Sequence, residues 1–118
     1  MNLLQLSLIG AGGALGAIAR VVFSQLLKSP PWDILLINFL GSLLIGLAMA
    51  WPGESVRPEI RQFLAAGFCG GFTTFSTFSF QTIELISKGK LSIATANIVF
   101  SVAVCLLGCW AGLQVAQR

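Results

Sequence analysis

Four long stretches without a charged side chain constrain the fold more than any other feature of this sequence. They cover residues 1–19, 34–53, 62–83 and 91–117. Each reaches the roughly 18 to 20 residues that an apolar helix needs to cross about 30 Å of hydrocarbon. Only 9% of the chain is charged, whereas about 25% is usual in a soluble domain. We therefore predict an all-α membrane protein, with residues 1–118 forming one domain of four transmembrane helices.

Proline and glycine residues set the limits of these helices. Pro30 and Pro31 end the first helix, Asp33 is a candidate cap for the second, and Pro58 precedes the third. The expected helices cover residues 3–27, 34–51, 59–86 and 91–115.

The third of these helices is predicted to be broken near its middle. It contains Gly67, Gly70 and Gly71, and five hydroxyl residues follow, which are Thr73, Thr74, Ser76, Thr77 and Ser79. Glycine lowers helix propensity, and Thr and Ser side chains compete for backbone groups. Irregular backbone at membrane depth persists only where protein buries it or where it lines a wet cavity.

The basic residues do not set an orientation in the membrane. An even number of spans puts both termini on one side, with Arg57, Arg61 and Arg118, and the other side carries Lys28, Lys88 and Lys90. This balance of three against three gives no bias under the positive-inside rule. We predict insertion in both orientations and an antiparallel, dual-topology homodimer. The alternative is that a signal other than these charges sets one orientation.

Two polar side chains inside the spans are candidates for function. Arg20 lies in the first span, where a charge is costly enough to suggest a role. It could attract anions to a vestibule, or it could be structural and extend to the interface. Asn38 lies one turn into the second helix, and its amide could donate to an anion or bridge helices.

The other recurring residues allow a structural and a functional interpretation. Phe75 and Phe78 share a helix face and have ring edges that could face an anion, although spacing alone favours core packing. Close helix packing accounts for most of the glycines. The three cysteines sit in apolar segments without a His or a CxxC pair, so we interpret them as small apolar residues.

Several classes of function are disfavoured. The chain has no His and no buried carboxylate pair, so we do not predict an enzyme. Its seven basic residues are dispersed, so nucleic acid is not an expected partner.

Three motifs occur in successive spans. They are Gly12-Gly13-Ala14-Leu15-Gly16-Ala17-Ile18-Ala19-Arg20, Asn38-Phe39-Leu40-Gly41-Ser42, and Gly67-Phe68-Cys69-Gly70-Gly71-Phe72-Thr73-Thr74-Phe75-Ser76-Thr77-Phe78. On these motifs the sequence resembles the CrcB/Fluc family of fluoride channels. The resemblance covers residues 5 to 115 and is most specific in the third motif.

The resemblance implies passive, fluoride-selective export that relieves fluoride toxicity, in the inner (plasma) membrane of a single-celled organism. It also implies a structural sodium ion at the dimer centre, held by backbone carbonyls that we carry over to Gly70 and Thr73. The implied fluoride path is formed by Asn38, Phe75, Ser76, Thr77 and Phe78, with Arg20 shaping the vestibule.

The sequence departs from the family pattern at three points. Val21 follows the motif arginine where an aromatic residue is usual, and Leu43 stands where Phe is common. The chain has no Tyr for the polar track expected on the fourth helix, where Ser101 or Asn97 could serve. These differences concern the outer pore contacts.

Two rival functions are compatible with four short apolar spans. A small multidrug-type, proton-coupled antiporter also has four helices, but it needs a protonatable carboxylate in the membrane. Glu84 is the nearest candidate, and its position close to Lys88 suggests an interfacial charge. A non-conducting assembly subunit would leave the hydroxyl and aromatic cluster without a role.

Overall fold

The computed structural model describes residues 1–53 and 56–117, which contain helices and no strand. The elements are α1 (Leu3–Leu27), α2 (Trp32–Ala50), α3 (Pro58–Gln62), the π-helix η1 (Phe63–Cys69), α4 (Gly70–Phe72), α5 (Phe75–Ser87) and α6 (Leu91–Ala116). Segments α3, η1, α4 and α5 together form the third span, Pro58–Ser87. Four helices are therefore long and apolar enough to cross a membrane, which confirms that part of the prediction.

Helix α2 begins two residues before the predicted start, and its first residue is Trp32. The Ser29 carbonyl accepts from the Asp33 N–H, and the Pro31 carbonyl accepts from the Leu35 N–H. Proline is compatible with this position because the first N–H groups of a helix have no intrahelical partner. The prediction that Asp33 caps the helix is wrong, since Pro31 is the N-cap and Asp33 lies in the first turn.

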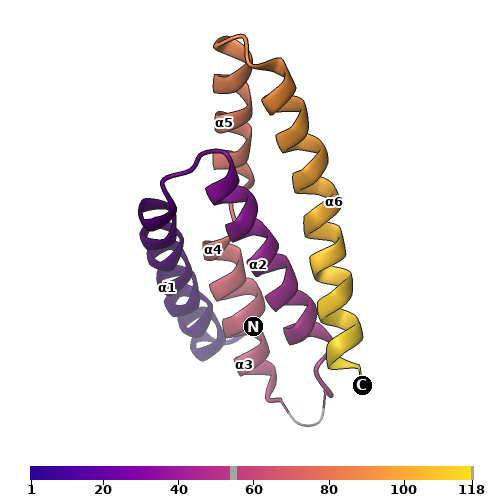
Figure 1. Ribbon diagram of the computed structural model, residues 1–118. Coiled ribbons are helices and arrows are strands. Elements are labelled where there is room, and N and C mark those ends of the chain that lie inside the picture. The colour runs from indigo at the N-terminus through magenta and orange to yellow at the C-terminus, as the bar shows by residue number, and fades with distance from the viewer. Residues whose placement is uncertain (54–55, 118) are drawn as a thin grey trace.

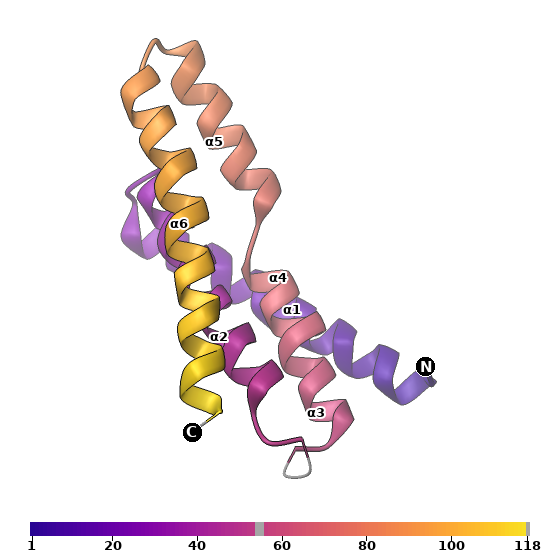
Figure 2. The ribbon, with the colours of Figure 1, turned by 90° about the vertical axis from the view of Figure 1, so that its right-hand side faces the viewer.

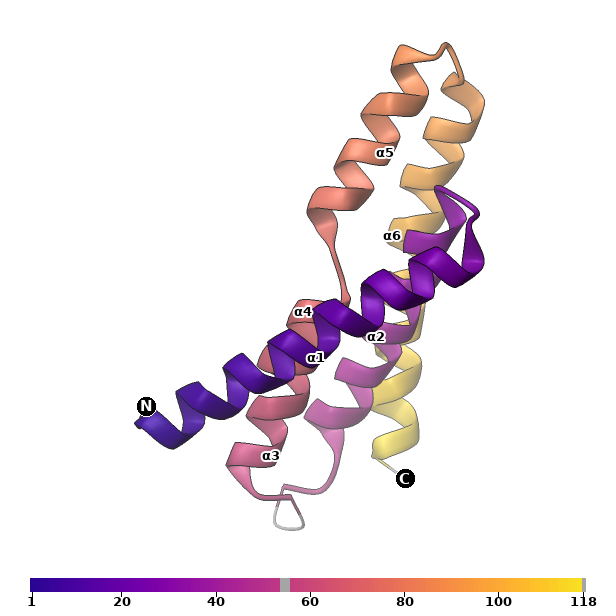
Figure 3. The same cartoon turned by 90° about the vertical axis from the view of Figure 1, so that its left-hand side faces the viewer.

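The spans pack as two close pairs. Helix α1 lies against η1 and α4, and α2 lies against α6. Figure 3 shows α1 crossing the third span obliquely, and Figure 2 shows both termini toward the end opposite the α5–α6 turn. An added Cβ at Gly16 would collide with the Phe68 carbonyl, and one at Gly46 with the Cys109 carbonyl. These glycines therefore let the helix backbones touch, as predicted from their small size.

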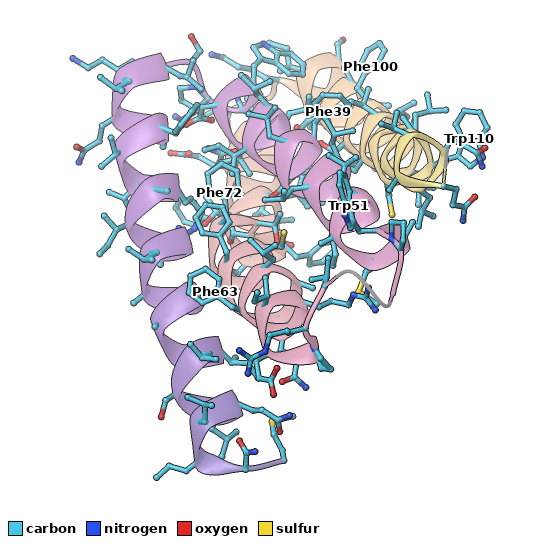
Figure 4. The ribbon with its side chains drawn as sticks, turned by 90° about the horizontal axis from the view of Figure 1, so that it is seen from below. Phe39, Trp51, Phe63, Phe72, Phe100 and Trp110 are labelled. Atoms are coloured by element: carbon cyan, nitrogen blue, oxygen red, sulfur yellow. The ribbon has the colours of Figure 1, made fainter. Side chains whose placement is uncertain are left out.

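Few side chains form an interior. Ile34, Ile37 and Phe72 make a buried cluster, and Phe72 stacks on Phe68 with a centroid distance of 5.5 Å. In Figure 4, Phe72 lies between α1 and the other helices, whereas Trp110 projects outward from α6. Most large apolar side chains are exposed, as expected for helices surrounded by lipid.

Helix α5 leaves the bundle at the break in the third span. Figure 1 shows it rising beside the first half of α6, beyond the point where α4 ends. Most of its contacts with other elements are made with α6. The break therefore separates a packed half of the third span from a sparsely packed half.

Candidate functional site

The break falls at two threonines rather than at the glycines. Gly70 and Gly71 remain helical in α4, whereas Thr73 (φ −82°, ψ 153°) and Thr74 (φ −150°, ψ 111°) are extended. The Thr74 hydroxyl caps α5 by accepting from the Thr77 N–H at 3.1 Å. The predicted break is confirmed, and competition by a hydroxyl side chain for backbone groups is its local cause.

Asn38 of α2 holds the extended segment in place. Its Oδ1 accepts from the Thr74 N–H at 2.8 Å, and its Nδ2 donates to the Thr74 carbonyl at 3.3 Å. One amide thus satisfies both backbone groups of a residue that has left the helix. Asn38 bridges two spans, and the second N–H of its amide is not used in these bonds.

Arg20 supports the other side of the break. Its Nε donates to the Gly71 carbonyl at 3.2 Å, across the contact between α1 and α4. A cation near the end of a helix also interacts favourably with the carbonyl groups there. The structural interpretation of Arg20 is therefore observed, and its effect on a vestibule stays a prediction.

A cavity of about 520 Å³ lies beside the break, between α2, η1, α5 and α6. The predicted site residues that line it are Asn38, Gly70, Thr73, Phe75, Phe78 and Ser101. Ser42, Cys69 and Cys105 also line it and were not among the predicted site residues. No Asp, Glu, Lys or Arg lines this cavity within residues 1–53 and 56–117. The structure thus brings most of the predicted residues together on one uncharged, partly polar surface.

Ser76 and Thr77 lie next to this cavity rather than in its lining. Their hydroxyls each lie 3.1 Å from the Thr74 hydroxyl, which donates to Thr77. The three hydroxyls form a small cluster at the start of α5. Thr74 lines the cavity and connects the cluster to it, whereas contact of Ser76 and Thr77 with fluoride stays a prediction.

Phe75 and Phe78 form a tilted pair in the lining of the cavity. Their ring centroids are 5.3 Å apart with planes at 47°. Phe75 is 78% exposed, so it is not a core residue of a single chain. Phe78 packs partly against the Ile34–Ile37–Phe72 cluster.

Two carbonyl groups at the break face no donor. Gly70 and Thr73 both line the cavity, and no described residue donates a hydrogen bond to either carbonyl. Their usual partners four residues later are engaged elsewhere, since the Thr74 N–H donates to Asn38 and the Thr77 N–H to Thr74. Such carbonyls suit a hard cation, which prefers oxygen ligands. Within the described residues, no cluster of acidic and Cys side chains could hold a metal instead.

A buried polar network joins α5 and α6 through Thr82, which was not among the predicted site residues. Asn97 donates to Thr82 at 3.0 Å and accepts from Ser101 at 3.2 Å. A signal was present, because Thr82 and Asn97 are polar residues inside otherwise apolar spans. The Ser101 proton is directed to Asn97, so in this arrangement its hydroxyl offers the cavity only acceptor positions.

The carboxylates of Glu84 and Asp33 have different surroundings. Glu84 is exposed and pairs with Lys88 at 3.2 Å, in agreement with the predicted interfacial charge. Asp33 is buried, and its carboxylate accepts from the Ser24 hydroxyl at 2.8 Å and from Gln81 at 3.3 Å. The prediction overlooked this carboxylate. It ties the first turn of α2 to α1 and α5 at the end of the bundle, outside the cavity lining.

Four apolar spans, one of them broken beside a partly polar cavity, define a small multi-pass helical membrane protein. The family model for CrcB-like protein, Camphor Resistance (CrcB), matches residues 7–113. The chain belongs to the CrcB family, and its spans place it in the cell membrane.

Curated relatives match over nearly their whole length. A protein of Geobacter sulfurreducens is 41% identical over 93% of this chain and 94% of its own. One of Rhodospirillum rubrum is 44% identical over 88% of each chain, and one of Pyrococcus horikoshii is 38% identical over 100% of each. All three relatives carry the name fluoride-specific ion channel FluC.

Proposed function

We propose that this chain is a fluoride channel that exports fluoride passively across the cell membrane. The observation that carries the proposal is the partly polar cavity at the break in the third span, where Asn38 holds Thr74 in place. The proposal that the conducted ion is fluoride rests on the names of the relatives. An ion channel performs no covalent chemistry, so no enzymatic activity is proposed.

The lining has the chemistry that a small, strongly hydrated anion requires. A pore must replace the water around fluoride with donors while holding the ion weakly enough to release it. The free N–H of Asn38 in the lining is such a donor, and the hydroxyls of Ser76 and Thr77 beside the lining are others. The ring edges of Phe75 and Phe78 add the positive end of the aromatic quadrupole. The absence of carboxylates from the described lining avoids repulsion of an anion.

The functional unit in this proposal is an antiparallel homodimer. The unpaired carbonyls of Gly70 and Thr73 and the side chain of Asn38 cannot face hydrocarbon at mid-membrane without a large penalty. A second copy of the chain would cover them and the exposed ring of Phe75. The charge balance between the two ends of the bundle supports insertion of the two copies in opposite orientations.

A structural sodium ion would sit where the two breaks meet. The carbonyls of Gly70 and Thr73 from each copy would provide oxygen ligands without a formal charge, which fits a hard monovalent cation. The ion would hold the two breaks together. The sodium ion would not contact fluoride in this proposal, since Asn38, Phe75 and Phe78 would do so.

Proton-coupled drug exchange is not favoured. Glu84 is exposed and already paired with Lys88, and the Asp33 carboxylate is hydrogen-bonded outside the cavity lining. Neither arrangement resembles a free carboxylate in a substrate path.

A cellular test uses a bacterial host whose own fluoride exporters have been deleted. Expression of this chain should restore growth in sodium fluoride and lower intracellular fluoride, with equal sodium chloride as the control for salt. The Phe75→Ile, Phe78→Met pair, present in the membrane at the same level, should restore growth poorly. No rescue by the intact chain at normal membrane levels would overturn the proposal.

A further inference from the structure

Helix α5 carries Phe75 and Phe78 and has few contacts with other helices. On the α2 side, Gln81 donates to Asp33 at 3.3 Å, and Phe78 packs partly against the Ile34–Ile37–Phe72 cluster. The extended pair Thr73–Thr74 separates it from α4, and Figure 2 shows it rising beside α6 beyond the end of α4. Most of its contacts are made with α6. The Gln81 and Phe78 contacts hold α5 on its α2 side, and a contact on the α6 side is needed as well if Phe75 and Phe78 are to keep one direction.

Asn97 of α6 makes the only side-chain hydrogen bond between α5 and α6 in the described part of the chain. Its Nδ2 donates to the Thr82 hydroxyl at 3.0 Å, and its Oδ1 accepts from the Ser101 hydroxyl at 3.2 Å. The Thr82 hydroxyl in turn donates to the Phe78 carbonyl at 2.8 Å. The chain of bonds thus runs from the cavity-lining Ser101 to the backbone of Phe78.

The direction of each bond is determined by its neighbours. Because the proton of Thr82 goes to the Phe78 carbonyl, Thr82 can only accept from Asn97. The Nδ2 of Asn97 must then face Thr82, which leaves Oδ1 for Ser101. Asn97 is 1% exposed and does not line the cavity, so this geometry gives it no contact with a conducted ion.

Rotation of α5 would break this network and turn the pore rings together. Phe78 and Thr82 are four residues apart and share one helix face. A change of rotation that moved the Phe78 ring would carry Thr82 away from Asn97. Leaving these groups unpaired in an apolar surrounding is unfavourable, so the network favours one rotation of α5.

We propose that Asn97 is a positioning residue for conduction, which fixes the direction of Phe78 through Thr82. This inference rests on the proposed fluoride conduction, but it concerns a residue that acts on the path only through α5. It assigns to Asn97 a role different from that of a polar-track residue that contacts the ion.

The experiment compares purified dimers with changes on either side of the bond. Asn97→Leu removes the amide, Thr82→Val removes the hydroxyl at nearly constant shape, and Thr82→Ser keeps the hydroxyl. Thr95→Val on the exposed face of α6 is the matched control. Fluoride flux per folded dimer should fall about three- to tenfold in Asn97→Leu and Thr82→Val, as expected for loss of one such bond in a membrane. Thr82→Ser and Thr95→Val should stay near the parent value.

A second readout separates this inference from the proposed function. A 4-fluorophenylalanine at Phe78 should give one ¹⁹F resonance in the parent dimer and a shifted or divided resonance in Thr82→Val, with recovery in Thr82→Ser. This readout decides the positioning role even if no fluoride flux is found. An unchanged resonance and unchanged flux per dimer in Thr82→Val would overturn the inference. If Asn97→Leu does not fold, the result for Thr82→Val alone tests the positioning role.

Discussion

Asn38 binds both the N–H and the carbonyl group of Thr74, with its Oδ1 2.8 Å from the Thr74 nitrogen and its Nδ2 3.3 Å from the Thr74 carbonyl oxygen. This single side chain stabilises an extended residue inside an apolar span. By accepting from the Thr74 N–H it leaves the Gly70 carbonyl without a helical partner, and the Thr74 hydroxyl does the same to the Thr73 carbonyl by accepting from the Thr77 N–H. The same amide therefore connects the broken helix to the cavity beside it.

Asn38→Ala should impair folding of the break and conduction together. It leaves two Thr74 backbone groups without partners, each of which costs about 1–3 kcal/mol when buried. We expect fluoride flux per dimer to fall at least about tenfold. The flux is measured in liposomes, with Gln114→Ala near the exposed end of α6 as an amide control. Flux near the parent value in Asn38→Ala would show that the clamp is not needed.

Gly41→Ala should destabilise the protein through Thr73. The new Cβ would collide with the Thr73 methyl group, which cannot turn away easily because the Thr73 hydroxyl donates to the Cys69 carbonyl at 2.8 Å. Overpacking of this kind costs about 1–3 kcal/mol. The melting temperature of the purified dimer should fall by about 5 °C or more.

The same collision suggests a compensating change. Thr73→Ser removes the methyl group and keeps the hydroxyl, so Gly41→Ala with Thr73→Ser should recover most of the lost melting temperature. Gly10→Ala serves as the control, since no atom lies within 4 Å of its added Cβ. If the double variant is no more stable than Gly41→Ala alone, the cause lies elsewhere.

Much of the fold could be predicted from the sequence because lipid imposes a strong length and charge rule. The four spans and the turn near Pro30 and Pro31 follow from it. The exact site of the break could not be predicted, because Gly70 and Gly71 have the lower intrinsic helix propensity. Gly71 packs closely against the backbone of Gly13 within the helix, and the break falls after it, where Thr74 caps α5.

The site was predicted only in part, because some of its contacts join residues that lie far apart in the sequence. Asn38 and the phenylalanines occur in a recognisable motif, but Thr82 and Asn97 lie 15 residues apart in different helices. Their pairing depends on how α6 folds back along α5 after the turn that joins them. Asp33 was misread because its burial comes from contacts with Ser24 and Gln81, which lie on other helices.

Dual topology predicts that both ends of the bundle are accessible from each side of the membrane. Ser87→Cys marks the α5–α6 end and Gly53→Cys marks the other end, and neither changes the charge balance. In a background without native cysteines, an impermeant maleimide added to intact spheroplasts should label about half of each. Full labelling of one position and none of the other would establish a single orientation.

Sodium should stabilise the dimer more than other monovalent cations. A ligand bound only to the folded state at about 100 times its Kd adds about 2.7 kcal/mol. The melting temperature of the dimer should therefore be higher in sodium than in potassium or N-methylglucamine at equal ionic strength. Equal melting temperatures in all three would remove the support for a sodium site at Gly70 and Thr73.

Fluoride efflux from liposomes that contain the purified protein tests the central claim most directly. A fluoride electrode records the efflux while valinomycin lets potassium leave and balance the charge. A chloride electrode records the chloride flux under the same conditions. We predict rapid efflux that strongly favours fluoride and falls in the Phe75→Ile, Phe78→Met pair. No fluoride efflux from a well-folded dimer, with and without sodium, or a chloride flux that rivals it, would contradict a fluoride channel built at the break of the third span.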